Sequence, residues 1–411
     1  MNQVSQNFLK NLPARHRIGT FWVTIFRFAT IIGIIALAIL LVTIIDDAFG
    51  YTVIENEINP GDLARDGISL DQMDKDQLVV VLEENISAGL FRRFEYDMPF
   101  EQRSREDVNS LIAERVIEPQ IVHQWSLIDS IFRKNSVIAT FESEYAGLEL
   151  KFMSWLDWQF IVSPQSADAV RAGVRTAILG TLWTIFIAIL FAFPIGVGAA
   201  IYLQEYARKD LWVNRLIQTN INNLAGVPSI IYGILGLAIF VRTLEALTSG
   251  AVFGILNPTE NGRTILSAGL TLGLLILPLI IINSQEAIKA VSNSLRQASF
   301  GLGATRWQTI WHHVLPSALP GILTGTILAI SRAIGETAPL VVVGASTFIT
   351  VDPSGPFSKF TTLPIQIYQW TSRPQDVFRS IAAAAIIVLL IMLLSMNAIA
   401  VLLRNRYTKR I

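Results

Sequence analysis

Long apolar runs alternate with polar segments along most of the chain. Six of these runs have the length, about 20 residues, that a helix needs to cross the hydrocarbon layer of a bilayer. They lie near residues 19–45, 174–203, 217–241, 265–283, 320–347 and 379–403. The pattern predicts an all-α polytopic membrane protein with six transmembrane helices.

The polar segment between the first two runs is long enough to fold on its own. It mixes strand-like and helix-like pieces, such as LVVVLEEN at 78–85 and DVNSLIAERVIE at 107–118. We therefore expect a first part with the N-terminus and one helix (1–45), an inserted domain of mixed α/β type (46–171) and a core with five helices (172–411).

A cluster of aromatic residues lies at the C-terminal end of the inserted domain. Trp155, Trp158 and Phe160 fall within residues 149–164, shortly before the second apolar run. Such side chains are typical of segments that lie in the lipid headgroup layer. The pattern favours this interpretation, with the ordinary core of the inserted domain as the alternative.

The polar stretch between the fourth and fifth runs, residues 283–321, is patterned like two short helices. Apolar residues three and four positions apart predict the first helix. They are Ile288, Val291, Leu295, Ala298 and Leu302. Gly301 and Gly303 then allow a tight reversal of the backbone.

The second helix begins at Thr305, which with Gln308 forms a capping box. A second apolar face follows, made of Trp307, Ile310, Trp311, Val314 and Leu315. Two helices joined by a glycine turn could insert into the groove of another protein. The alternative is a loop that merely packs beneath its own spans.

Arg332 and Glu336 interrupt the fifth apolar run near its middle. Four residues apart on a helix, they face the same way and can pair. Charges at that depth are costly, and they usually face a bundle interior or an aqueous path. Pro339 weakens the helix beside them. The pattern favours a translocation path or gate, with an inert ion pair that fixes helix packing as the alternative.

Composition and charge support a membrane protein with a separate acidic domain. Hydrophobic residues make up 52% of the chain, and charged residues 16%. Residues 46–168 hold 24 acidic and 10 basic side chains, a balance of 10 − 24 = −14, so the remainder carries +14. No cysteine is present, so the inserted domain folds without disulfides.

Basic residues gather in the loops on one side of the predicted spans. They are Lys10, Arg15, Arg17, Arg208, Lys209, Arg215, Lys289, Arg296, Arg306, Arg404, Arg406, Lys409 and Arg410. By the positive-inside rule these loops and both termini are cytoplasmic, and the acidic domain is outside. The first apolar run is too long for the core of a signal peptide and should be retained as a span.

Several kinds of chemistry are missing from the sequence. It contains no G-x-x-x-x-G-K-[ST] phosphate-binding loop, no G-x-S-x-G elbow and no cysteine nucleophile. The four histidines are not spaced as metal ligands. We expect no catalysis by this chain, no bound metal or cofactor and no nucleic acid partner.

The stretch 283–321 resembles the EAA loop of permease subunits from binding-protein-dependent ABC transporters. The matching positions are Gln297, Ala298, Ser299, Gly303, Leu315 and Pro316. Gln297 replaces the leading Glu of that motif. SRAIGETAPL at 331–340 resembles the signature of phosphate ABC permeases, the PstA and PstC subunits, and residues 193–207 and 222–241 resemble PstA in particular.

The resemblance covers about residues 150–405, and the long acidic insertion departs from the family pattern. It implies the type I ABC importer permease fold in a bacterial plasma (inner) membrane, with this chain forming half of a path for inorganic phosphate. It also implies a second, PstC-like permease subunit, two PstB-like cytoplasmic ATPases that use ATP and Mg, and a PstS-like extracytoplasmic binding protein.

Three groups of candidate residues follow. The path or gate is expected at Arg332, Glu336, Gly335, Pro339 and Ser229. The ATPase coupling loop (283–317) is expected to act through Gln297, Ala298, Ser299, Gly301, Gly303, Ala304, Thr305 and Trp307. Arg171 and Arg175, near the outer mouth, would either attract anions or meet lipid headgroups.

Two other functions remain open on the sequence alone. One is a permease for another oxyanion, such as molybdate or sulfate. The other is a membrane-anchored sensor, which would need neither charges inside a span nor an ordered cytoplasmic loop, and which would purify without an ATPase.

Overall fold

The structure is a computed structural model. It describes residues 12–64, 68–97, 99–117, 119–166, 168–208, 210–254, 262–345, 348–349 and 351–408. Four basic residues counted in the charge pattern, Lys10, Lys209, Lys409 and Arg410, lie outside the described residues.

Five described helices are long and apolar enough to cross a membrane. They are α2 (Leu12–Ala48), α9 (Arg175–Ile201), α13 (Ile265–Lys289), α16 (Leu315–Ile334) and α19 (Val377–Thr408). A sixth candidate is the pair α10 (Trp212–Ala225) and α11 (Ser229–Gly236), the latter continued by the π-helix η6 (Leu237–Thr243). The six crossings therefore stay a prediction, because the sixth depends on this pair.

The pattern predicts the third apolar run, 217–241, as one helix, and the structure divides it into a bent pair. The axes of α10 and of α11 with its continuation differ by 107° at a short break. The break falls at Gly226 and Pro228, and Pro228 has the extended ψ of 137°. Proline also disfavours helical geometry in the residue before it, which explains why the helix cannot run through.

Helix α13 lies at the centre of the helical part, where α9 and α16 pack against it. Of its most apolar window, 67% is buried, against 0% for α2 and 6% for α19. Gly269 of α13 faces Ile187 of α9, and small residues of this kind let two helices approach closely. The outermost helices, α2 and α19, are left with apolar surfaces that suit lipid.

Between α2 and α9 the chain forms an antiparallel sheet of strand order β2-β1-β3. Its strands are β1 (Phe49–Glu55), β2 (Gln120–Gln124) and β3 (Glu149–Ser154), with Thr52 opposite both Gln124 and Lys151. Strand β1 follows α2 directly. The mixture of strands and helices agrees with the pattern, although LVVVLEEN belongs to a helix and not to a strand.

Two groups of helices extend from this sheet. The first, between β1 and β2, has its own core and contains η1 (Leu70–Gln72), α3 (Lys75–Asn85), α4 (Ala88–Asp97), η2 (Phe100–Gln102), α5 (Arg105–Ile112) and η3 (Ala113–Ile117). The second, between β2 and β3, contains α6 (Leu127–Phe132) and α7 (Lys134–Glu144). Short helices α8 (Trp158–Val162) and η4 (Ala169–Arg171) lead into α9.

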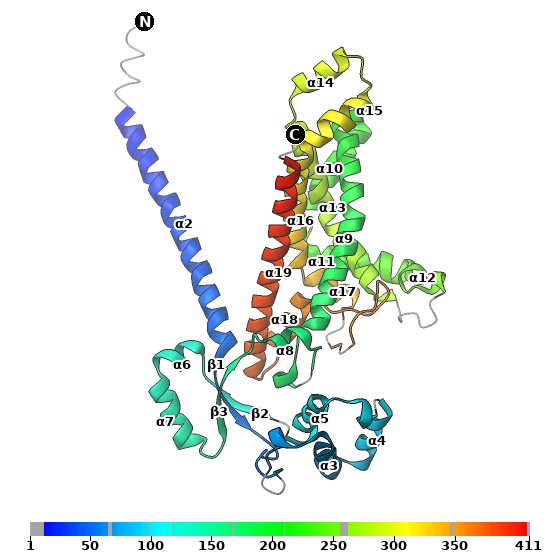
Figure 1. The fold of residues 1–411 in the computed structure, drawn as a ribbon. Coiled ribbons are helices and arrows are strands. Elements are labelled where there is room, and N and C mark those ends of the chain that lie inside the picture. Colours follow the sequence, from blue (N-terminus) through cyan, green and yellow to red (C-terminus); the bar gives the residue numbers. More distant parts are fainter. Residues whose placement is uncertain are drawn as a thin grey trace.

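The remaining short elements connect the long helices. They are η5 (Tyr202–Tyr206), α12 (Glu245–Thr248), η7 (Ala251–Phe253), α14 (Asn293–Gly301), α15 (Arg306–Thr309), η9 (Ile310–Val314), α17 (Ala338–Val343) and α18 (Leu363–Thr371). Figure 1 shows α14, α15, the start of α2 and the end of α19 at one end of the helices, and the strands at the other. Helix α2 stands apart and meets α19 only near the strands.

The aromatic residues at the end of the inserted domain differ in burial, so neither the headgroup-layer nor the core interpretation fits all of them. Trp155 and Phe160 are 4% and 5% exposed and belong to a core that includes Trp370. The headgroup interpretation is therefore wrong for these two residues. Trp158, at the start of α8, is 76% exposed.

Candidate translocation path and coupling loop

The run that carries the charged pair is broken into two helices. Helix α16 ends at Ile334, Gly335 forms its C-cap, and α17 begins at Ala338 with Pro339 as its second residue. The expectation of one continuous helix over 320–347 is therefore wrong. Proline is well tolerated in a first helical turn, where its missing N–H costs nothing, so Pro339 begins a new helix here instead of kinking an old one.

Arg332 and Glu336 lie on the two sides of the α16 terminus. Arg332 is in the last turn of α16, where the helix dipole favours a cation, and Glu336 is in the break. The Nε of Arg332 is 3.4 Å from Oε1 of Glu336. The Arg332 side chain is 46% exposed and that of Glu336 19%. The pair is therefore open to the surface of this chain and not sealed inside it.

The two broken helices meet. Helix α11 packs on α17, and a Cβ on Gly233 would lie 2.6 Å from Cα of Pro339, so only glycine permits this approach. The hydroxyl of Tyr232 donates to the carbonyl of Leu224 at 2.7 Å across the α10–α11 break. Ser229 is the first residue of α11 and is partly buried.

Broken helices that contact each other are an arrangement suited to a transport path. Non-helical backbone at membrane depth is tolerated where it is buried in protein or lines a water-filled cavity. Transporters use such discontinuous helices to present polar backbone and charged groups to substrate. The sequence predicted the charges and the prolines but not the α11–α17 contact, because that contact joins segments about a hundred residues apart.

The coupling loop has the predicted reversal and cap. Gly303 has a φ of +83°, which favours glycine, and α14 and α15 flank it. The hydroxyl of Thr305 accepts from the N–H of Gln308 at 3.3 Å, and the amide oxygen of Gln308 accepts from the N–H of Thr305 at 2.9 Å. The capping box is thus confirmed.

The first apolar stripe is wrong as a single helix. Helix α13 runs to Lys289, so Ile288 is buried within it, and the chain restarts as α14 after Ser292 caps it. Leu302 is 91% exposed. The inner side of α14 is instead polar, because Ser299 Oγ lies 2.9 Å from Oγ1 of Thr309 and both residues are buried.

The second apolar stripe divides into an inner and an outer part. Ile310 and Val314 are buried, while Trp307 and Trp311 are 57% and 53% exposed and stack with centroids 5.5 Å apart. Other predicted coupling residues also lie outward. Ala304 is partly buried, and the exposed ones are Gln297, Ala298, Gly301, Gly303 and Thr305. The loop therefore presents an uncovered surface with large aromatic side chains.

A partly buried ion pair attaches this loop to the helical core. Nη2 of Arg296, on α14, lies 2.7 Å from Oε1 of Glu205, on η5, and the side chains are 13% and 12% exposed. Arg296 also donates to the carbonyls of Ile288 and Val291 at the end of α13. No local pattern in the sequence indicates this pair, because its members are 91 positions apart.

The outer-mouth arginines are each paired with a carboxylate. Nε of Arg171 is 3.4 Å from Asp168, and Nε of Arg175 is 2.8 Å from Asp352. Arg171 also donates to the carbonyl of Ala113 at 2.9 Å. Their charges are partly neutralised, and the role of either residue in attracting anions stays a prediction.

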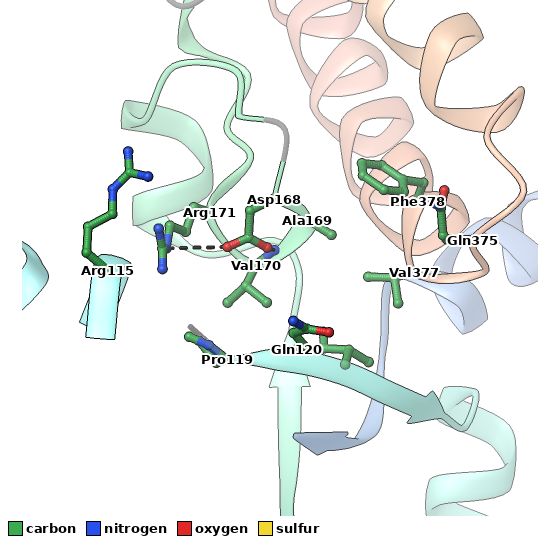
Figure 2. Close-up of a pocket in the computed structure, with 11 residues that line it drawn as sticks. Arg115, Pro119, Gln120, Asp168, Ala169, Val170, Arg171, Gln375, Val377 and Phe378 are labelled. Carbon is green, nitrogen blue, oxygen red and sulfur yellow. Dashed lines mark hydrogen bonds and ion pairs between the residues drawn. The ribbon is translucent and has the colours of Figure 1, made fainter. Parts of the chain in front are cut away.

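Arg171 also lines a cavity of about 440 Å³ between the inserted part and the start of α19. Figure 2 shows it with Asp168, to which it is joined, and with Gln375 and Phe378 across the space. The cavity lies where the insertion meets the last span. Among the described residues, no group of three or more histidine or acidic side chains could hold a metal ion.

Comparison with known proteins decides the family. Residues 192–409, more than half of the chain, match the family described as "Binding-protein-dependent transport system inner membrane component". The chain belongs to this family. It is therefore a multi-pass membrane protein and the permease subunit of an ABC importer, a class of subunit that is not itself an enzyme. The inserted residues 46–171 lie outside the match.

Individual relatives agree with the assignment. The "Phosphate transport system permease protein PstA 1" of Mycobacterium tuberculosis (strain CDC 1551 / Oshkosh) is 31% identical over 294 residues, covering 67% of this permease and 90% of the relative. The "Probable ABC transporter permease protein YqgI" of Bacillus subtilis (strain 168) is 34% identical over 219 residues, covering 53% and 68%.

A solved structure titled as the MetNI methionine ABC transporter in inward-facing conformations is also similar. It is 18% identical to this permease, with a TM-score of 0.42, and covers 58% of this chain and 95% of that one. Because this likeness is low, the family assignment depends on the sequence matches.

Proposed function

We propose that this permease carries inorganic phosphate inward as one half of a translocation path. The observation that carries the proposal is the 31% identity over 294 residues to a relative named as a PstA phosphate permease. Relatives from Mycobacterium leprae and Yersinia pestis carry the same PstA name at 32% and 31% identity.

The exposed Arg332 gives this substrate a physical basis. A guanidinium offers a planar fork of donors that matches the oxygens of a phosphate-like anion. Glu336 occupies the guanidinium in the free protein, with a separation of 3.4 Å. An arriving anion would compete for Arg332, and the break at Gly335 would let the two sides of the pair move apart. Pro339, Ser229 and Gly335 would shape this gate.

The coupling loop would dock on a cytoplasmic ATPase. Its exposed Trp307 and Trp311 suit insertion into a hydrophobic groove. The full transporter would then hold this chain, a second PstC-like permease subunit and two PstB-like ATPases, which use ATP and Mg. A PstS-like binding protein would deliver phosphate, because an insertion with a charge balance of −14 repels anions and does not collect them.

The proposed orientation places the coupling loop and both termini in the cytoplasm of a bacterium and the insertion outside its inner membrane. The bent pair α10–α11 then counts as one crossing, which brings the spans to six. This arrangement puts the two ends seen in Figure 1 on opposite sides of the membrane.

Uptake of labelled phosphate tests the proposal. We expect a bacterial strain that lacks this chain to regain energised uptake when the chain is restored, with unlabelled phosphate but neither molybdate nor sulfate abolishing it. Competition by molybdate or sulfate with no effect of phosphate would assign the permease to another oxyanion. A chain that purifies without an ATPase would contradict coupled transport altogether.

A further inference from the structure

Helix α6 of the inserted part presents its apolar side outward. Ile128, Ile131 and Phe132 are 45%, 60% and 81% exposed, and their spacing of three and four residues places them on one face. Ser130 faces inward and is 4% exposed. Its hydroxyl accepts from the N–H of Tyr51 on β1 at 2.9 Å.

This arrangement is the reverse of that of a helix on a water-facing domain. Such a helix buries its apolar side chains against the protein and turns polar ones outward. Contiguous exposed apolar side chains usually mark a surface that meets another protein or a membrane. The position of α6 in the molecule decides between these partners.

Helix α6 begins where the first span ends. The backbone N–H of Ile128 donates to Oδ1 of Asp46, in the last turn of α2, at 2.6 Å. Just before Asp46, Val42 and Ile45 are 53% and 39% exposed. Since the apolar window of α2 is 0% buried, the exposed face of α6 continues an apolar surface that lipid must already cover. Figure 1 shows α6 beside this end of α2.

The residues around the apolar face suit lipid headgroups. Arg133 and Lys134 follow α6 directly and are exposed, and the Arg133 side chain is 75% exposed despite its contact with Asp129 at 3.3 Å. Basic side chains beside an apolar helix face are typical of helices that lie in the membrane interface. Trp158 is 76% exposed at the start of α8, a short helix that contacts α9, the next span.

We infer that α6 is an interfacial anchor, with Ile128, Ile131 and Phe132 inserted into the leaflet at which α2 ends, and Arg133 and Lys134 at the lipid phosphates. The partner is the lipid surface and not a protein. The anchor would hold the strand β1 and the sheet at a fixed distance from the membrane. It does not depend on which substrate the permease carries.

Spin labels on single cysteines test the anchor, since the chain has no cysteine of its own. The variants Ile131→Cys and Phe132→Cys would be labelled in the assembled transporter in phospholipid vesicles. The readout is accessibility to oxygen, which concentrates in lipid, against a water-soluble nickel chelate. Glu142→Cys, at an exposed position of α7, is the matched control.

We expect oxygen to dominate at positions 131 and 132 and the nickel chelate at 142, so the logarithm of their ratio changes sign. Adding Ile131→Ser to Phe132→Cys should shift the label at 132 towards water. Nickel access at 131 and 132 equal to that at 142 would overturn the anchor. Shielding from both reagents would assign the face to a protein partner and would overturn it too. Neither result bears on transport.

Discussion

The setting of Arg332 and Glu336 suits a pair that an anion can separate better than a pair that stabilises helix packing. Partial exposure of 46% and 19% leaves the guanidinium accessible, and a separation of 3.4 Å is long for a charge-assisted hydrogen bond. A pair that only fixed helix packing would be expected to be sealed among helices of its own chain. The break at Gly335 adds freedom of movement at the same place.

Neutralising either member of this pair should impair transport. A charge-assisted hydrogen bond between Arg332 and the transported anion would contribute about 1.5–3 kcal/mol. Arg332→Gln removes this bond and Glu336→Gln removes the proposed competitor, so each should lower the uptake rate at least about tenfold. Uptake of labelled phosphate into vesicles with the purified transporter is the measurement, at equal amounts of assembled protein.

Arg379→Gln is the matched control for this experiment. Arg379 pairs with Asp376 at 3.5 Å in a similar local arrangement, but its side chain is 71% exposed at the start of α19. Exposed pairs of this kind contribute little, so uptake should stay near the unaltered level. Unimpaired uptake in both Arg332→Gln and Glu336→Gln would rule out a gate at this site.

At the scale of elements, the coupling loop has defined local contacts and is attached to the core. The capping box fixes the start of α15, and Gly303 sets the reversal. Arg296 then joins α14 to Glu205 on η5 and to the end of α13. A force that an ATPase applies to the loop would reach α9 and α13 through this connection.

Breaking the Arg296–Glu205 pair should weaken coupling. Removing one partner of a fully buried pair costs about 3–5 kcal/mol, and the loss at Arg296 and Glu205, which are 13% and 12% exposed, should be smaller. Glu205→Gln should therefore reduce both copurification of the ATPase and substrate-stimulated ATP hydrolysis, with Arg332 and Glu336 unaltered. Both quantities would be measured on the purified transporter.

Arg208→Gln, three positions after Glu205, serves as the control. Arg208 donates to Asp210 at 2.9 Å and so lowers the pKa of Asp210, but both side chains are well exposed. Its loss should leave coupling unchanged. If Glu205→Gln behaved like Arg208→Gln, the pair would have no part in coupling.

At the scale of the whole molecule, the chain divides into two ends joined by long helices. The coupling loop, the start of α2 and the end of α19 lie at one end, and the sheet with its helices lies at the other (Figure 1). Among the described spans, α13 has the largest buried share of its most apolar window, 67%, against 0% for α2 and 6% for α19. Their surfaces remain for lipid and for the proposed second permease subunit.

Labelling from one side of the membrane should reveal this polarity. Leu302→Cys in the coupling loop, Glu142→Cys in α7 and Val252→Cys after α12 are single thiols at exposed positions. In intact cells made permeable only at the outer membrane, an impermeant maleimide should react at 142 and 252 but not at 302. Lysis should make 302 reactive.

Position 252 distinguishes a crossing from a re-entrant loop. If α10 and α11 together cross the membrane, Val252→Cys reacts from outside like Glu142→Cys. Reaction at 252 only after lysis would mean that the bent pair returns to the cytoplasmic side, and Leu302→Cys should then react from outside, because α13 separates the two positions. Five spans would then replace six.

The sequence by itself determined the features that depend on neighbouring residues. Apolar runs located every long helix, and the spacing of Thr305 and Gln308 located a helix start that the hydrogen bonds reproduce. Arg332 and Glu336 were recognised as a pair because four residues is one helical turn. Such features need only the local geometry of the backbone, which a few consecutive side chains decide.

Only the tertiary structure decided which faces are covered. Trp155 and Trp158 look alike in the sequence, yet the first is 4% exposed and the second 76%. Arg296 pairs with the carboxylate of Glu205, 91 positions away, and the apolar side of α6 faces outward beside the end of α2. Burial and long-range pairing depend on which elements meet in space, and a local pattern of apolar and polar residues does not specify its partner.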